Sequence, residues 1–201
     1  PWLARDHAVT MLPSVASLKI LRALPPGAPA RKVFAGFGNP WFSVEQAAAA
    51  TQVATATQRA VVATRGLRTR GIAVRLRAAP KTAGLDSAEL ARLPRLPDTA
   101  EEVRAIAVAL DADLTQDVFL GRRANETTIK SLDLSGFKVL AFATHGLVPG
   151  DLNGLTQPAL ALSSPQVTGD KDDGLLTMGE ILGLKLDADW VVLSACNTGS
   201  G

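Results

Sequence analysis

The sequence predicts an α/β fold in which a mostly parallel sheet is flanked by helices. Short, continuous apolar runs recur at residues 33–37 (VFAGF), 138–144 (KVLAFAT) and 189–195 (DWVVLSA). Such runs are typical of strands that are buried on both faces of a parallel sheet. Amphipathic helical segments alternate with these runs, as they do in α/β domains. The chain has 201 residues, of which 47% are hydrophobic, so it can form one domain with a substantial core.

The first elements follow this alternation. Residues 13–24 (PSVASLKILRAL) have apolar side chains at nearly helical spacing and predict a helix. The strand at 33–37 is followed by a Gly-Asn-Pro turn. Ser43 and Gln46 then have the spacing of a capping box, which predicts the start of an Ala-rich helix that runs to about residue 63.

The stretch from Arg65 to Arg95 interrupts the regular pattern. It is rich in Arg and broken by Gly and Pro, and we expect an edge strand within residues 71–80. Its Arg residues alternate with apolar ones and have no aromatic residues between them. This composition favours a solvated surface over a nucleic-acid interface.

The second half of the chain returns to alternating elements. Residues 98–112 predict an amphipathic helix with Asp98 and Glu101 as its capping box. Further elements are expected in the following order: a strand at 117–121, a helix at 125–134 capped by Asn125, the strand at 138–144, a short strand at 159–163, a helix whose capping box is Thr177 and Glu180, and the strand at 189–195.

Composition excludes several classes of function. Aromatic residues make up only 4% of the chain and Tyr is absent, which argues against a surface that stacks nucleic-acid bases. A single Cys rules out an internal disulfide and a Cys-based zinc site. There is no apolar run long enough to span a membrane and no evident signal peptide. We therefore expect a cytoplasmic protein without a metal or other cofactor, and without nucleic-acid or membrane partners.

His145 and Cys196 each follow a predicted core strand. Because the carboxyl ends of neighbouring parallel strands share one edge of a sheet, we expect both residues at the same edge. An imidazole that takes the proton of a thiol produces the thiolate, which is the nucleophilic form. Glycines beside both residues favour tight turns whose backbone N–H groups can stabilise an oxyanion. The alternative is that Cys196 is a packed core residue and His145 a polar group at a strand end.

The interval between these two residues favours catalysis. Caspases have their catalytic His about 50 residues before the catalytic Cys, and His145 and Cys196 are 51 positions apart.

The chain also resembles the CHAT domain, a caspase-like family of the clan that includes separases and metacaspases. The motifs that carry the resemblance occur in the family's order and are LPSVASLKIL, VFAGFGNP, LPDTAEEVRAIA, VLAFATHG, PALALS, DGLLTMGEI and LDADWVVLSACNTGSG.

The resemblance implies a single caspase-like domain over residues 1–201, with a three-layer fold and residues 65–95 as a variable insert. It implies that His145 and Cys196 form a catalytic dyad, and that the backbone N–H groups of Gly146 and Cys196 form the oxyanion hole. The family's sheet continues beyond the Cys motif, so we expect a domain that is truncated at its C-terminus and these 201 residues alone to have little peptidase activity. Family members often follow tetratricopeptide arrays, which would lie upstream of Pro1.

The leading functional hypothesis is a cysteine endopeptidase that cleaves a protein substrate in a signalling or defence pathway. The main alternative is a non-catalytic caspase-like scaffold or signalling module that acts by binding other proteins. A third hypothesis is a packed α/β domain in which the Cys has no chemical role.

Overall fold

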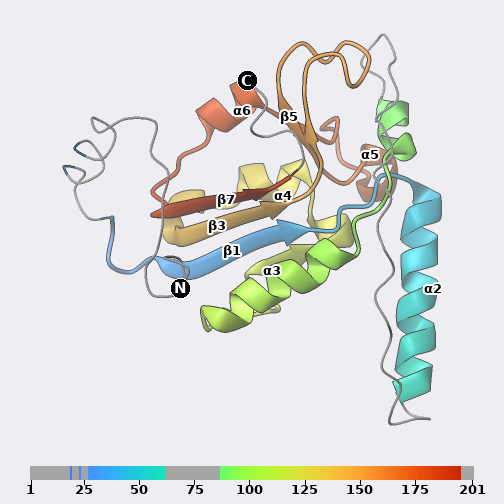
Figure 1. The fold of residues 1–201 in the computed structure, drawn as a ribbon, viewed down its shortest axis with the longest axis horizontal. Helices are drawn as coiled ribbons and strands as arrows, with labels where there is room; N and C mark the ends of the chain where they lie inside the picture. Colours follow the sequence, from blue (N-terminus) through green and yellow to red (C-terminus); the bar gives the residue numbers. More distant parts are fainter. Residues whose placement is uncertain (1–18, 20–22, 24–26, 62–86, 196–201) are drawn as a thin grey trace, which may run out of the picture.

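The computed structural model describes residues 19, 23, 27–61 and 87–195. Its centre is a four-stranded parallel sheet with the order β2-β1-β3-β7 (Figure 1). The strands are β1 (Lys32–Gly38), β2 (Val118–Leu120), β3 (Phe137–Ala143) and β7 (Trp190–Ser194). All four match predicted strands, and β3 and β7 lie side by side as expected.

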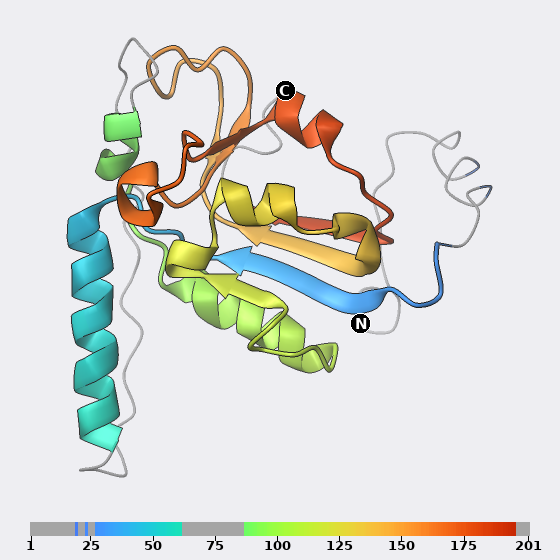
Figure 2. The ribbon, with the colours of Figure 1, turned by 180° about the vertical axis from the view of Figure 1, so that it is seen from behind.

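Helices cover both faces of this sheet, which gives three layers (Figures 1 and 2). Helix α3 (Asp98–Ala109) packs on one face, where Val103 and Ala107 meet Phe34 of β1. Helices α4 (Glu126–Ser131) and α6 (Met178–Gly183) pack on the other face. A larger core fills that side, with Phe37, Phe119, Phe142, Ile129 and Leu140 among its buried residues. The predicted three-layer α/β fold is therefore confirmed.

A second sheet lies near the carboxyl ends of the parallel strands. It is antiparallel and consists of β4 (Gly146–Leu147), β5 (Ala159–Ala161) and β6 (Leu175–Thr177). Of these three strands, only β5 was predicted from the sequence. This sheet shares a core with η2 (Ser87–Arg92), and the buried side chains of that core are Phe42, Leu90, Leu93, Leu147, Leu152, Leu155, Ala159, Ala161 and Leu175.

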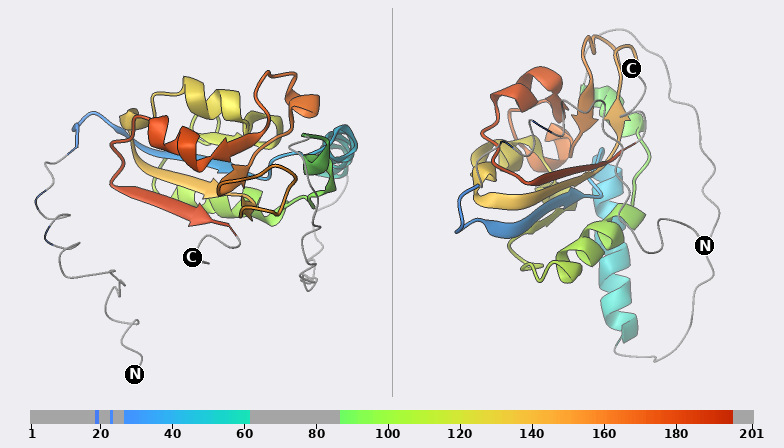
Figure 3. Two further views of the ribbon diagram at one scale, coloured as in Figure 1. Left: turned by 90° about the horizontal axis from the view of Figure 1, so that it is seen from above. Right: turned by 60° about the vertical axis from the view of Figure 1, so that its left-hand side comes forward.

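Helix α2 (Val44–Val61) begins where predicted and extends away from the main sheet (Figures 1 and 3). The Ser43 hydroxyl accepts a hydrogen bond from the Gln46 N–H at 3.2 Å. The Gln46 side chain accepts from the Phe42 N–H at 2.9 Å, one residue earlier than a regular capping box requires.

None of the helices within the described residues is both long and apolar enough to cross a membrane.

The other predicted caps have different outcomes. The capping box at Asp98 and Glu101 is wrong: Asp98 is already inside α3, and the residue before it, Pro97, makes no side-chain cap. The cap of α4 is confirmed, because Asn125 Oδ1 accepts from the Thr128 N–H at 2.6 Å. The described part of the chain also contains the short elements η3 (Gly121–Arg123), η4 (Leu134–Gly136) and α5 (Pro165–Thr168).

Some expectations fall on residues that the structure does not describe. The helix expected at 13–24 is described only at Lys19 and Ala23, which are both helical. The edge strand expected within residues 71–80 lies outside the described residues.

Strand β7 is the outer strand of the described sheet. Its apolar side chains are exposed, with Trp190 at 66% and Leu193 at 47%. Both faces of the strand are apolar in sequence, which predicted a position inside a sheet. Among the described residues only β3 pairs with it.

We expect Gly36→Ala to destabilise the fold by about 1–3 kcal/mol, because the core at this position has no room for a methyl group. A Cβ at Gly36 would lie 2.4 Å from Phe34 Cζ and 2.5 Å from Val103 Cγ1. Gly183→Ala is the matched control, since a Cβ at Gly183 meets no described atom within 4 Å. Urea denaturation of both variants checks this; equal midpoints would contradict the tight packing of β1 against α3.

Candidate active site

His145 lies directly beyond β3, and hydrogen bonds fix the backbone on either side of it. The Thr144 hydroxyl donates to the carbonyl oxygen of Ala161 in β5. The carbonyl oxygen of His145 accepts from the Ala161 N–H at 2.9 Å. The residue therefore sits where the parallel sheet meets the small antiparallel sheet, and its side chain is half-buried.

Contacts with the ring determine its protonation pattern. His145 Nε2 lies 2.8 Å from the carbonyl oxygen of Pro94. A carbonyl oxygen can only accept a hydrogen bond, so Nε2 must carry the proton. In the neutral ring Nδ1 is then the unprotonated nitrogen, which can act as a base. The Phe42 ring packs beside the imidazole, with its centroid 5.5 Å away, and restricts the rotation of the ring.

The segment that carries the Pro94 carbonyl is itself held in place. Leu90 and Leu93 are buried in the core beneath the small sheet. The Gln46 side-chain amide donates to the carbonyl oxygen of Leu93 at 2.8 Å. The contact to His145 comes from a backbone atom, for which the sequence offers no recognisable pattern. The described end of the expected insert, residues 87–95, thus contributes to the surroundings of His145.

The parallel register brings the end of β7 beside the end of β3. Ala143 is paired with Ser194, so these two strands end at the same edge of the sheet. His145 follows Ala143 by two positions, and Cys196 follows Ser194 by two positions. Cys196 itself lies outside the described residues.

Gly146, the expected oxyanion donor, is the first residue of β4 and pairs with Leu160. The neighbouring pair of His145 and Ala161 is hydrogen-bonded through Ala161 N–H. In an antiparallel ladder, hydrogen-bonded and non-hydrogen-bonded pairs alternate. The N–H of Gly146 therefore points away from β5 and is not used by this ladder.

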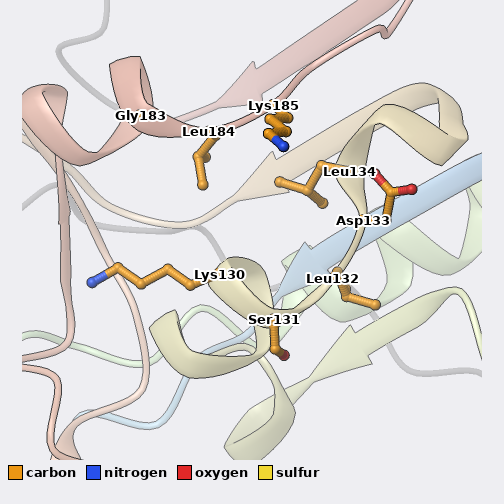
Figure 4. A pocket seen from close by; sticks show the side chains of 8 residues that line it. All are labelled: Lys130, Ser131, Leu132, Asp133, Leu134, Gly183, Leu184 and Lys185. Carbon is orange, nitrogen blue, oxygen red and sulfur yellow. The ribbon is translucent and has the colours of Figure 1, made fainter.

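A pocket of about 390 Å³ lies elsewhere in the molecule, between α4 and α6 (Figure 4). The residues that line it precede β3 and β7, whereas His145 follows β3, so the pocket is not part of the surroundings of His145. Its lining consists of Lys130, Ser131, Leu132, Asp133, Leu134, Gly183, Leu184 and Lys185. Within the described residues, no group of three or more His, Cys, Asp or Glu side chains is placed to hold a metal ion.

A charged cluster joins α4, α6 and the loop before β6. Lys130 Nζ lies 2.5 Å from Glu126, 2.8 Å from Glu180 and 3.2 Å from Asp172. Glu126 also accepts from the N–H of Gly174 at 3.0 Å and is almost fully buried. Burial, together with the nearby charge of Glu180, raises the pKa of Glu126 to about 7. Burial opposes ionisation of Glu180 too, but hydrogen bonds from Lys130 and Thr177 lower its pKa to about 2.

We expect Glu126→Gln to reduce the loss of stability that occurs as pH rises towards 7. The pKa of Glu126 is about 7 in the folded chain against an ordinary 4.5, so folding favours the protonated form. The stability that protonated Glu126 adds to the folded state is fully present below about pH 4.5 and is lost as pH rises through 7. The pKa of Glu180 is lowered, so the ionised form of Glu180 stabilises the folded chain. This stabilisation is fully present above about pH 4.5 and is lost as pH falls towards 2.

Free energies of unfolding at pH 5 and pH 8 test this expectation. The difference between the two pH values should be smaller in Glu126→Gln than in the unmodified chain. Glu101→Gln, at an exposed position of α3, is the control and should leave the difference unchanged. A difference that is the same in all three proteins would show that Glu126 does not titrate in this range.

Comparison with protein-family models matches residues 1–201 to the CHAT domain. Comparisons with curated proteins and with solved structures gave no significant match.

Proposed function

Because the chain belongs to the CHAT domain family, which is related to caspase-like cysteine peptidases, we propose that it is a cysteine endopeptidase that cleaves a protein substrate. In this proposal Cys196 is the nucleophile and His145 is the base. The observation that carries it is the setting of His145, whose Nε2 is engaged by the Pro94 carbonyl so that Nδ1 remains as the basic nitrogen.

The sheet register supports the same pairing. Ala143 lies opposite Ser194, and the two proposed catalytic residues each follow two positions later. The strands that precede the two proposed catalytic residues are therefore neighbours and end at the same edge of the sheet. This is where ligands bind in open α/β sheets.

The proposed reaction has two stages. Nδ1 of His145 takes the proton of Cys196, and the thiolate attacks the carbonyl carbon of the peptide bond. The N–H of Gly146, which the β4–β5 ladder leaves unused, and that of Cys196 donate to the oxyanion. The imidazolium then protonates the leaving amine, and an acyl-enzyme forms. Water, deprotonated by His145, hydrolyses that thioester and regenerates the thiol.

Alkylation of the single cysteine tests the proposed pair directly. Iodoacetamide should label Cys196 at pH 6–7 faster than it labels free cysteine, because the imidazole increases the thiolate fraction. In His145→Ala the rate should fall to that of an ordinary thiol, which has a pKa near 8.5. A rate that is the same in both proteins would mean that His145 does not activate Cys196.

Identification of new protein N-termini in cells separates a peptidase from a scaffold. Cells that express the full-length protein should accumulate cleavage products that are missing when Cys196→Ala is expressed instead. If cells with the unmodified protein and cells with Cys196→Ala have identical sets of protein N-termini, the alternative is favoured, namely a module that acts by binding.

A further inference from the structure

Glu89 in η2 is a buried acidic side chain, with 7% of its surface exposed. Both of its carboxylate oxygens accept hydrogen bonds from one residue, Asn153. Oε2 accepts from the backbone N–H at 3.0 Å, and Oε1 accepts from Nδ2 at 2.7 Å. Arg92 Nη1 lies 3.5 Å from Oε1, but the Arg92 side chain is 57% exposed. Removing a carboxylate from water is costly unless hydrogen bonds compensate, so the two bonds from Asn153 offset part of this cost.

Asn153 lies in the loop between β4 and β5, which follows His145 in the chain. Its Oδ1 is buried and makes no hydrogen bond within the described residues, so the donors of this residue are directed at Glu89. The loop is closed by the Gly150 N–H, which donates to the carbonyl oxygen of Leu155 at 3.1 Å. Glu89 is therefore bonded to a defined turn.

The helix that carries Glu89 leads into the segment whose carbonyl binds the candidate base. η2 ends at Arg92, and Pro94 O lies 2.8 Å from His145 Nε2. Glu89 precedes Pro94 by five positions, and Asn153 follows His145 by eight positions. The same two segments of the chain are thus joined twice, once at the imidazole and once at the buried carboxylate.

The other contacts of η2 leave a specific task for these hydrogen bonds. Leu90 of η2 and Leu152 of the loop are buried in the core beneath the small sheet. Hydrophobic contacts are non-directional, so they resist separation of the two segments but not a small slide or rotation. The Gln46 amide fixes the end of η2 to α2 and not to the loop. The bonds between Glu89 and Asn153 are directional and set the register of η2 against the loop.

We propose that Glu89 is a positioning residue for the candidate base. Through Asn153 it holds η2 against the loop that follows His145, and this keeps the Pro94 carbonyl in place at Nε2. Without this hold the imidazole would also populate its other tautomer, in which Nδ1 carries the proton and cannot act as a base. The proposal rests on the proposed peptidase function and adds a residue that acts on the base without contacting the substrate.

Glu89→Gln in the full-length protein tests the proposal. A Gln side chain can accept only one of the two hydrogen bonds, because its amide nitrogen would face a donor of Asn153. We expect kcat for cleavage of a protein substrate to fall by roughly 10- to 100-fold with KM unchanged, since a misplacement of about 1 Å can cost about 10²-fold. Arg92→Gln is the matched control, because it removes the neighbouring charge but neither hydrogen bond, and it should keep the wild-type kcat.

A double variant restores both bonds with their direction reversed. In Glu89→Gln with Asn153→Asp, the introduced amide can donate to the introduced carboxylate, and its oxygen can accept the backbone N–H. This variant should recover most of the kcat that Glu89→Gln loses. Asn153→Asp alone places two carboxylates together and should be at least as impaired as Glu89→Gln. Thermal denaturation shows that each variant is folded at the assay temperature. A folded double variant without recovery would overturn the role of Glu89.

The tautomer of His145 separates failure of this proposal from failure of the peptidase hypothesis. NMR of the full-length protein with isotope-labelled histidine shows which ring nitrogen carries the proton, and the His145→Ala spectrum identifies the signals. The wild type and the double variant should have the proton on Nε2, and Glu89→Gln should show both forms. A mixture in Glu89→Gln without any cleavage by the wild type would refute the peptidase function alone. Cleavage by the wild type, with the same kcat and tautomer in Glu89→Gln, would refute the role of Glu89 alone.

Discussion

Cys196→Ala should abolish proteolysis by the full-length protein while leaving its fold intact. The thiolate is the only group in the proposed mechanism that forms a bond to the substrate, so its removal should lower cleavage by more than about 10³-fold. Ala is close in size to Cys, which behaves in a core as a small hydrophobic residue. The measurement is cleavage of a protein substrate, with circular dichroism and thermal denaturation as the check on folding.

His145→Ala should be almost as severe, and the double variant should be no worse than Cys196→Ala. Residues that act as one catalytic unit fail together, because the thiol without its base and the base without its thiol are both nearly inactive. Additive losses in the double variant would indicate two independent roles. Comparable cleavage by Cys196→Ala would refute the thiol mechanism altogether.

The sheet was predictable because its strands are nearly continuous apolar runs. VFAGF, KVLAFAT and WVVLS each form a strand of the parallel sheet, and their ends fall within a residue or two of the predicted positions. A strand that is buried between two helical layers needs apolar side chains on both faces, and this requirement is visible in the sequence. The pairing of β3 with β7 then followed from the handedness of crossover connections.

Much of the setting of His145 was not predictable, because backbone atoms and long-range packing create it. The carbonyl of Pro94 is an acceptor that any residue would provide, so no side-chain pattern marks it. Arg95 lies in a stretch that was expected to be a solvated insert, since its Arg-rich composition resembles a surface. Its partial burial results from its contact with Asn39, which is 56 positions away in the sequence.

Local rules also failed where tertiary contacts offered a competing arrangement. Asp98 has the spacing of a capping residue, yet α3 starts one position earlier, after Pro97. Thr99 near that end donates to the Leu96 carbonyl and accepts from Asn39, so its hydroxyl joins α3 to the end of β1. The N-terminus of α3 is thus arranged around a contact with the sheet edge, which a local sequence pattern cannot show.

Phe42→Ala should impair both stability and catalysis. Phe42 is fully buried in the core under the small sheet, and its ring packs beside the imidazole of His145. Truncation of a buried Phe to Ala costs about 3–5 kcal/mol. The cavity would also free His145 to rotate away from the Pro94 carbonyl, and a misplacement of about 1 Å can lower a rate by about 10²-fold.

The kinetic effect can be separated from the loss of stability with milder substitutions. Phe42→Leu nearly preserves volume but removes the ring from the imidazole, and we expect kcat to fall by about 10-fold with KM unchanged. Phe34→Leu is the matched control, because Phe34 is equally buried but packs against α3 rather than His145. It should lose a similar amount of stability and keep its kcat. If both Leu variants kept the wild-type kcat, Phe42 would be a core residue only, and the hydrogen bond to Pro94 would suffice to orient His145.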